Sequence, residues 1–394
     1  MGTFQGNQPQ HQAQALDTFI EIRRQIHAAP ELGGDTPETA RLVAEQLQAW
    51  GYEVHRNVGG HGVVGVLKVG DSPRSIGLRA DMDALPMSEK NPFAHASKIP
   101  GRMHACGHDG HTAILLAAAS QLAATKRFNG TLNVIFQPDE EGLAGAKAMI
   151  DDGLFERFPC DSVYALHNMP GLPVGACVVQ SGPTMASSLR VSIRITGKGG
   201  HGAMPELSVD PISALNSLIS GIQTIKSRNL SVEEYAVISI GMIQSGSVYN
   251  IIPDEASMLL SVRTDTAETQ AKIQRRLEAL VTGHEASFGV QIELQYTPLA
   301  PALINTDEES EQLRESLRPL FGEGMLLNRM PRKIMGTEDF AYMLQQRPGC
   351  YFILGNGTGE FHGCSVHNPH YDFNDALVKI GSECWVKWVQ DCLC

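Results

Sequence analysis

Alternating helical and strand-like patterns of apolar residues fill the first part of the chain. Apolar positions recur at helical spacing over residues 37–47 and again over 112–125. Strand-like apolar runs occupy residues 62–69, 75–80 and 131–136, and acidic residues follow within three positions of the end of each of the last two runs. Open α/β sheets place their ligands just beyond strand ends. The pattern therefore predicts an α/β fold with a site at one edge of its sheet.

A different order of elements occupies residues 187–298. The pattern there predicts strand, helix, strand, strand, helix, strand. This βαββαβ order is typical of a ferredoxin-like unit, which closes on itself and can be inserted into another domain. We therefore predict a discontinuous α/β domain, residues 1–186 and 299–394, interrupted by a smaller domain at 187–298.

Composition and charge narrow the classes of partner. The chain has 394 residues, 42% of them hydrophobic, and a formal net charge of -12. This charge repels the phosphates of nucleic acids and anionic membrane surfaces, so we expect neither as a partner. No stretch approaches the ~20 apolar residues that a membrane helix needs. We expect a soluble cytoplasmic protein whose eight cysteines are mostly reduced.

The densest group of candidate metal ligands is HACGHDGH, residues 104–111. A thiolate at Cys106 and an imidazole at His108 can face one divalent cation, because Gly107 between them permits an unusual backbone bend. A loop with incidental polar residues is a poor alternative for so dense a cluster. The sequence alone leaves open which of its histidines bind metal.

Two adjacent carboxylates, Glu140 and Glu141, follow the strand at 131–136. Adjacent carboxylates repel each other unless a cation or a proton neutralises one of them. One could bind a metal while the other takes a proton from water, which is the division of roles that hydrolysis needs. Taken alone, a solvated acidic turn is the simpler interpretation.

Other polar residues stand at the ends of neighbouring strands. Asp81 and Asp83 could orient histidine ligands by hydrogen bonding, although an aspartate that starts a turn is an equal alternative. His167 ends an apolar run at 162–166. A single histidine there is more often a structural residue, but it lies on a third predicted strand of the same sheet.

Eight motifs in one order connect these sites across nearly the whole chain. They are RADMDALPM, HACGHDGHTA, QPDEEG, ALHNMPGLPVG, GKGGHGAMP, SVYNIIPDEA, MGTEDFAYML and HNPHYDFND. Together they resemble metallopeptidase family M20, in the subgroup of N-acyl-amino-acid amidohydrolases that includes hippurate hydrolases and auxin-conjugate hydrolases.

The resemblance implies a site with two divalent metal ions and Glu140 as the general base. Zinc, manganese, cobalt and nickel all suit such donors. The implied ligands are Cys106, His108, Glu141, His167 and His367. Because His370 lies only three residues beyond His367, the choice of His367 as the last ligand depends on the resemblance and not on spacing.

The resemblance also implies roles for the inserted domain, as a lid and as the site of homodimerisation. His201 and Asn250 match positions that polarise the scissile carbonyl, and the histidine is supplied across the dimer interface. Arg263 matches an arginine that receives a substrate carboxylate, although a surface charge at a strand end is an equal alternative.

The reaction that we expect is metal-dependent hydrolysis of an N-acyl amino acid to a carboxylic acid and a free amino acid. A deacetylase of the N-acetyl-diaminopimelate type and a hydrolase of indoleacetyl conjugates are alternatives with the same core. A binding module that has lost catalysis is an alternative from another class, but the set of ligands and base is complete. A structural zinc site would leave Glu140 and Glu141 unexplained.

Overall fold

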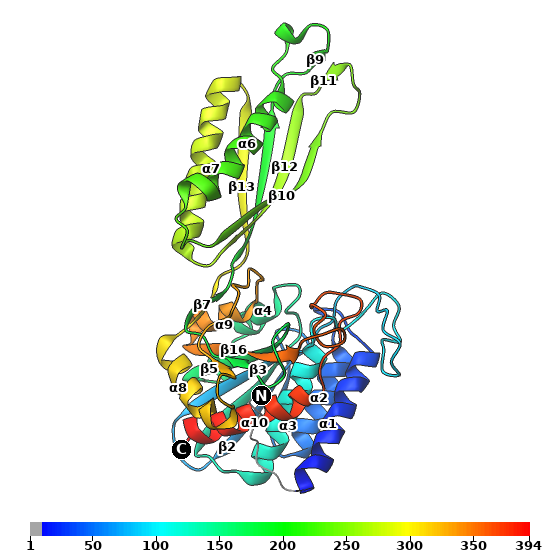
Figure 1. Cartoon of the computed structure of the whole chain (residues 1–394), viewed down its shortest axis with the longest axis vertical. Coiled ribbons are helices and arrows are strands. Elements are labelled where there is room, and N and C mark those ends of the chain that lie inside the picture. Colours follow the sequence, from blue (N-terminus) through cyan, green and yellow to red (C-terminus); the bar gives the residue numbers. More distant parts are fainter. Residues whose placement is uncertain (1–9) are drawn as a thin grey trace. The chain divides into compact units, whose positions relative to one another are not determined.

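The computed structural model describes residues 10–394, which form two compact units (Figure 1). The first unit comprises the described residues up to Gly182, together with Ile304–Arg332 and Asp339–Cys394. The second, which we call the inserted unit, comprises Pro183–Leu303 and Lys333–Glu338. The chain therefore returns briefly to the inserted unit after leaving it.

An eight-stranded mixed sheet forms the centre of the first unit, in the order β1-β2-β4-β3-β5-β16-β6-β15. The strands β4, β3, β5 and β16 pair in parallel, and β1, β2 and β4 pair antiparallel. Every residue of β3 and β16 is buried, as expected for parallel strands covered on both faces. The strands are β1 (Glu53–Val58), β2 (Gly62–Val69), β3 (Ser75–Asp81), β4 (Gly130–Gln137), β5 (Ser162–Pro170), β6 (Cys177–Val178), β15 (Leu326–Leu327) and β16 (Gly349–Gly357).

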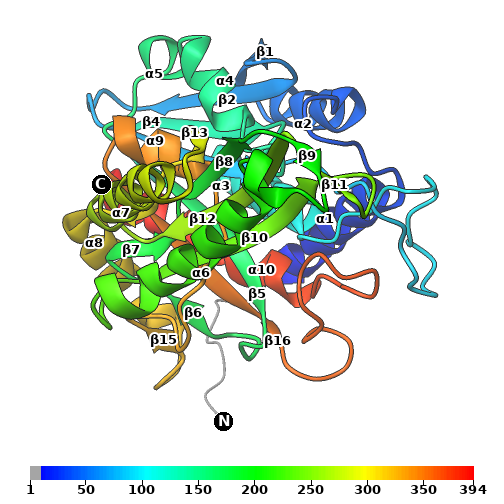
Figure 2. The same ribbon diagram turned by 90° about the horizontal axis from the view of Figure 1, so that it is seen from above.

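Helices surround this sheet, and α3 is the most deeply buried of those that bear on the site. It packs against β3, α1 and α10, so apolar residues are needed on nearly all of its faces. Figure 2 shows α1 and α2 on one side of the first unit and α8 and α9 on the other. Among the described residues, no helix is long and apolar enough to cross a membrane. The helices are α1 (Gln10–Ala28), α2 (Pro37–Ala49), α3 (His108–Thr125), α4 (Gly145–Asp151), α5 (Leu154–Arg157), α8 (Asp307–Leu317), α9 (Phe340–Gln346) and α10 (Ala376–Cys392), with a 3-10 turn at Arg318–Leu320.

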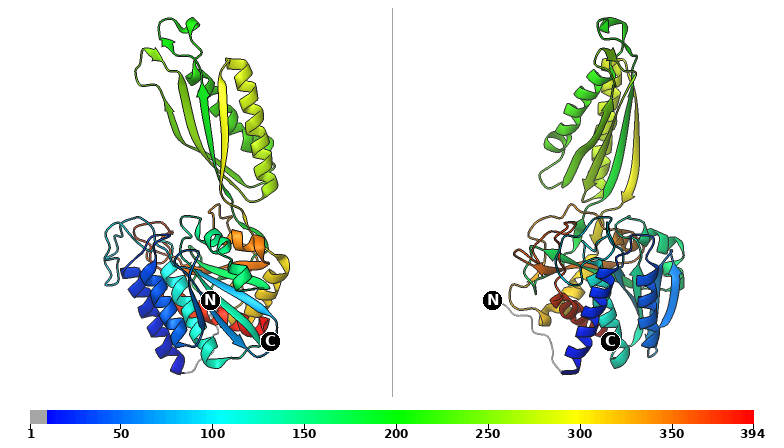
Figure 3. Two further views of the ribbon diagram at one scale, coloured as in Figure 1. Left: turned by 180° about the vertical axis from the view of Figure 1, so that it is seen from behind. Right: turned by 90° about the vertical axis from the view of Figure 1, so that its right-hand side faces the viewer.

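The inserted unit has the chain order β8-α6-β10-β12-α7-β13, and its four strands form an antiparallel sheet in the order β10-β12-β8-β13. Both helices cover one face of this sheet and leave the other face open (Figure 3). Each helix begins with a side-chain cap: the Asp210 side chain accepts a hydrogen bond from the backbone N–H of Ile212, and the Thr266 side chain accepts one from that of Thr269. The elements are β8 (Ser188–Thr196), α6 (Pro211–Asn229), β10 (Ala236–Ser245), β12 (Glu255–Thr264), α7 (Ala267–Phe288) and β13 (Gln291–Ala300).

Short elements complete the inserted unit. The strands β9 (Gly200–His201) and β11 (Ile251–Ile252) pair as a small ribbon, and a 3-10 turn covers Pro205–Leu207. The chain crosses between the units through β7 (Gly182–Met185) and β14 (Leu303–Asn305).

Candidate active site

The turn that precedes α3 brings Cys106 and His108 to the carboxyl edge of the parallel strands. Gly107 adopts a φ of +97°, in the left-handed region that favours glycine. A Cβ atom at this position would lie 2.4 Å from Asn168 Oδ1 and 2.5 Å from Tyr371 Oη, so a larger residue does not fit. The bend that the sequence predicts at Gly107 is therefore present.

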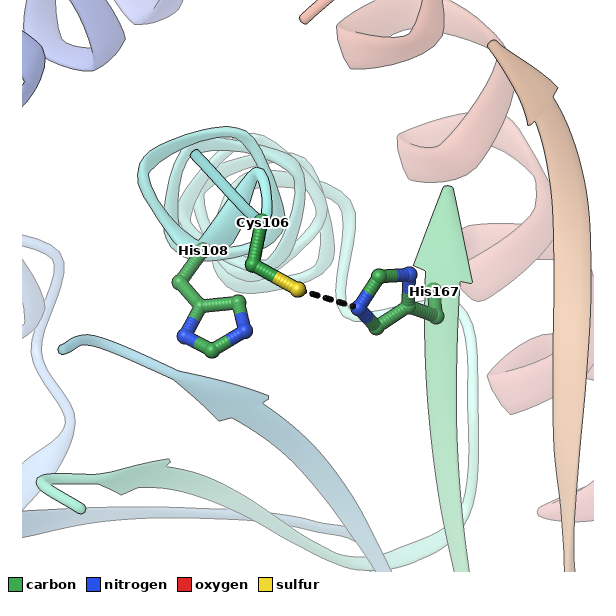
Figure 4. Close-up of side chains that lie close together, drawn as sticks. All are labelled: Cys106, His108 and His167. Carbon is green, nitrogen blue, oxygen red and sulfur yellow. Dashed lines mark hydrogen bonds between the residues drawn. The ribbon is translucent and has the colours of Figure 1, made fainter. Parts of the chain in front are cut away.

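Two groups of metal-ligating atoms converge here, and Cys106 belongs to both. Within each group, the ligand atoms lie within 4.8 Å of one another. Cys106 Sγ lies 3.4 Å from His167 Nε2 at the end of β5 (Figure 4). If each group held a cation, Cys106 would be available to both of them. The groups are Cys106, His108 and His167, and Cys106, Glu141 and His367.

His367 reaches the site from the loop before α10. Its Nε2 lies 3.3 Å from Glu141 Oε1, and its backbone N–H donates a hydrogen bond of 2.8 Å to Ala105 O. Its φ of +61° lies in the left-handed region, where a residue other than glycine is held at a cost. His370 is exposed, and its backbone N–H bonds to Asn368. The structure thus places His367 beside Glu141.

Asp83 holds two of these residues. One oxygen accepts a hydrogen bond from His108 Nδ1 at 3.1 Å, and the other accepts one from the Glu141 backbone N–H at 2.9 Å. Burial opposes ionisation of Asp83, but the bond from His108 lowers the pKa of this carboxyl. With its proton on Nδ1, neutral His108 presents the lone pair of Nε2 to the centre of the site.

Asp81 has a different partner. Its Oδ1 accepts a hydrogen bond of 2.6 Å from His111 Nδ1, and Arg79 donates to its Oδ2 at 2.7 Å. His111 Nε2 in turn lies 2.8 Å from Asn168 Oδ1. Asp81 therefore supports His111, a residue whose role the sequence did not predict, and lies 3.8 Å from His108 Nε2.

Buried atoms without hydrogen-bond partners indicate that this cluster fits a cation. Among the described residues, no hydrogen bond reaches His108 Nε2 or Glu141 Oε1, although both atoms are buried. Leaving such groups unsatisfied costs about 1–3 kcal/mol each. Burial raises the pKa of the Cys106 thiol to about 12, so the thiolate needs positive charge beside it. Divalent cations bound to these nitrogen, sulfur and oxygen donors would satisfy all three residues.

Glu140 lies at the same centre and is buried. Its Oε2 is 3.9 Å from His108 Nε2, and Glu140, His108 and Glu141 form another group of closely spaced potential ligands. The two adjacent glutamates thus both face the site.

The inserted unit carries His201 and Asn250 side by side. His201 on β9 pairs with Ile251 on β11, directly after Asn250, and Gly202 N–H donates to Asn250 O at 2.9 Å. The backbone N–H of Ala203 donates to His201 Nδ1 at 3.0 Å. In the neutral imidazole the proton is therefore on Nε2, which makes this exposed side chain a hydrogen-bond donor.

Arg263 lies at the opposite end of the inserted unit from His201. The β9–β11 ribbon adjoins the start of β12, where Gly199 N–H donates to Asp254, and Arg263 is the penultimate residue of β12. Eight steps of ~3.3 Å separate Glu255 from Arg263, a distance of about 26 Å. Burial lowers the pKa of Arg263, and among the described residues no carboxylate pairs with it.

A buried ionic cluster beneath the site was missed by the sequence analysis. Asp109 Oδ2 accepts hydrogen bonds of 2.9 Å from both Arg23 and His27 of α1, and His27 Nε2 lies 3.2 Å from Glu89. Burial opposes protonation of His27, but Asp109 raises its pKa to about 9. Because Asp109 directly follows His108, this cluster supports the first turn of α3. The one sequence signal for this cluster was the position of Asp109 inside the HACGHDGH motif.

Comparison with known proteins identifies the family. Residues 77–391 match Peptidase family M20/M25/M40. The chain belongs to this family. A hippurate hydrolase of Campylobacter jejuni is 44% identical over 370 residues, which are 94% of this chain and 95% of that protein. An N-acetylcysteine deacetylase of Bacillus subtilis is 35% identical, over 93% and 94% of the two chains.

A solved structure agrees with this assignment. The YXEP protein of Bacillus subtilis, described as a dinuclear metal binding peptidase from the M20 family, superposes with a TM-score of 0.85. It is 30% identical and covers 97% of this chain and 99% of its own. The predicted family, α/β fold class and metal-dependent amidohydrolase activity are thereby confirmed.

Proposed function

We propose that this protein hydrolyses the amide bond of N-acyl amino acids, with hippurate-like aromatic acyl groups preferred, to a carboxylic acid and a free amino acid. The observation that carries the proposal is the convergence of two ligand groups on Cys106 beside the buried Glu140. The relative that acts on hippurate supports the acyl preference.

Two divalent cations, zinc, manganese, cobalt or nickel, would be held by the two groups that share Cys106. His108 and His167 would complete one set of ligands, and Glu141 and His367 the other. When bound, the cations supply Lewis acidity toward the substrate carbonyl and increase the acidity of water.

Glu140 acts as the general base in this proposal. Its carboxylate accepts a proton from the attacking water and delivers it to the leaving nitrogen, which must leave as an amine. Asp83 contributes by holding the side chain of His108 and the backbone of Glu141 in place.

Residues of the inserted unit bind the substrate. The Nε2–H of His201 and the side-chain amide of Asn250 donate hydrogen bonds to the developing oxyanion, and one such donor is typically worth ~10²–10³ in rate. Arg263 receives the α-carboxylate, because its half-buried guanidinium has no carboxylate partner among the residues described.

A homodimer reconciles the positions of His201 and Arg263. In an N-acyl amino acid, only the amide nitrogen and one carbon separate the scissile carbonyl from the carboxylate. Side chains about 26 Å apart along β12 cannot both contact such a molecule. We therefore propose that His201 reaches the substrate from a second copy of the chain.

The edge strand β10 is our candidate for the dimer contact. It is the outermost strand of its sheet, and it exposes Val237, Met242 and Ile243. An exposed apolar edge strand is a template for pairing with another chain.

The cytoplasm fits as the location, because all eight cysteines are free.

A substrate panel tests the proposed function. Hippurate, N-acetylcysteine, N-acetyl-diaminopimelate and indoleacetyl amino acids are assayed with zinc, manganese, cobalt or nickel, and Glu140→Gln is the control. We expect the highest kcat/KM with hippurate. Selective hydrolysis of N-acetyl-diaminopimelate, or turnover that Glu140→Gln retains, would contradict the proposal.

A further inference from the structure

The short segment Lys333–Glu338 is fastened to the inserted unit beside Arg263. Lys333 Nζ forms an ion pair of 2.7 Å with Asp265, and the same ammonium lies 4.3 Å from the ring centre of Tyr235. The backbone N–H of Ala186 donates a bond of 2.8 Å to Gly336 O. These contacts fix the position of the segment relative to the end of β12.

One side chain of this segment bonds to Arg263 itself. Arg263 Nη1 donates a hydrogen bond to the hydroxyl of Thr337. A hydroxyl can accept from a guanidinium without neutralising it, so the positive charge remains available to an anion. Within residues 10–394, no second acceptor bonds to this guanidinium, so its other N–H groups can bind a carboxylate in a bidentate way.

We propose that Thr337 is a positioning residue that orients Arg263 to receive the α-carboxylate of the substrate. The inference rests on the proposed function of Arg263. It assigns to the returning segment a part in substrate specificity, because the segment sets how strongly the enzyme selects acyl amino acids with a free carboxylate.

The test compares Thr337→Val, which removes the hydroxyl at constant shape, with Thr337→Ser, which keeps it. KM and kcat are measured for hippurate and for benzoylglycinamide, which lacks the negative charge and is measured as a competitive inhibitor if its turnover is slow. We expect Thr337→Val to raise KM for hippurate roughly tenfold, since a hydrogen bond to a charged group is lost, and to change kcat less than about twofold.

The neutral substrate and two further variants serve as controls. Benzoylglycinamide binding should be unchanged in Thr337→Val, and Thr337→Ser should resemble the wild type. Thr282→Val removes a threonine hydroxyl from the exposed face of α7 in the same unit, where it bonds only to Glu278 O, and should leave both substrates unaffected.

Two outcomes would overturn the role of Thr337. One is an unchanged KM for hippurate in Thr337→Val, and the other is an equal loss of affinity for hippurate and benzoylglycinamide. The variant Arg263→Ala separates this inference from the function on which it rests. If Arg263→Ala keeps the wild-type preference for hippurate over the amide, the proposed role of Arg263 fails; if it loses that preference while Thr337→Val keeps it, only the present inference fails.

Discussion

Exchange of subunits between two inactive variants tests whether His201 acts across a dimer. Within one chain, His201 adjoins the start of β12 and Arg263 lies near its end, about 26 Å away. If one bound substrate contacts both residues, as we propose, the histidine must come from the partner subunit. Glu140 acts in the subunit that holds the metal ligands.

The expected activity follows from counting intact sites. We co-express His201→Ala and Glu140→Gln subunits with different affinity tags and purify the mixed dimers through both tags. In a mixed dimer, the His201→Ala subunit keeps its own Glu140 and receives an intact His201 from its partner. The other site lacks both groups. The mixed dimer should therefore hydrolyse hippurate at about half the wild-type rate, while each variant alone is nearly inactive.

The reversed arrangement supplies the matched control. A subunit that carries both substitutions is paired with a wild-type subunit. If His201 acts across the dimer, neither site is complete and the activity is lost. Activity of about half the wild type in this control, together with none in the first mixed dimer, would show that His201 acts in its own subunit and not across the dimer.

Further predictions concern single residues of the first unit. Glu140→Gln should retain bound metal and lose most of kcat, because an amide cannot accept the proton of water, whereas Glu141→Gln should lose metal. Metal analysis and kinetics of both variants test this, and the reverse pattern would show that the base and the ligand have been exchanged. Gly107→Ala should lower the free energy of unfolding by roughly 1–3 kcal/mol and weaken metal binding, since its φ of +97° and the nearby Asn168 oppose a Cβ; unchanged denaturation and metal affinity would contradict this. His27 has a pKa raised to about 9, so its contribution is present below its unfolded pKa near 6.5 and lost as pH rises through 9. Between pH 6.5 and 9.5, the free energy of unfolding of the wild type should fall by about 3 kcal/mol more than that of His27→Gln, because the variant has no such titrating group. Parallel pH profiles of the two proteins in denaturant titrations would disprove this.

Elements with a clear hydrophobic period could be predicted from the sequence. The strand expected at residues 62–69 is β2, and the second helix expected in the inserted segment is α7, which begins at the side-chain cap of Thr266. The strand β16 (Gly349–Gly357) was not predicted, although it lies beside β5 at the centre of the sheet. Its sequence GCYFILGNG contains three glycines and no alternation, because both of its faces are buried.

The candidate ligands could be identified because metal chemistry restricts them to a few residue types in dense motifs. The sharing of Cys106 by two groups could not, because it depends on where β5 and the loop of His367 lie in space. His27 and Thr337 were missed for the same reason. Each acts through one contact with a residue far away in the sequence, Asp109 or Arg263, and neither lies in a pattern of its own.

Hippurate hydrolysis measured against bound metal shows whether two cations at the Cys106 cluster are required for activity. The purified protein is stripped with a chelator and then titrated with manganese or zinc, and metal per chain is determined by mass spectrometry alongside the rate. We expect no hydrolysis in the stripped protein, full activity at two ions per chain, and weakened binding in Cys106→Ser because both groups lose their shared sulfur. Full activity at a metal content near zero, or normal binding of two ions by Cys106→Ser, would contradict this expectation.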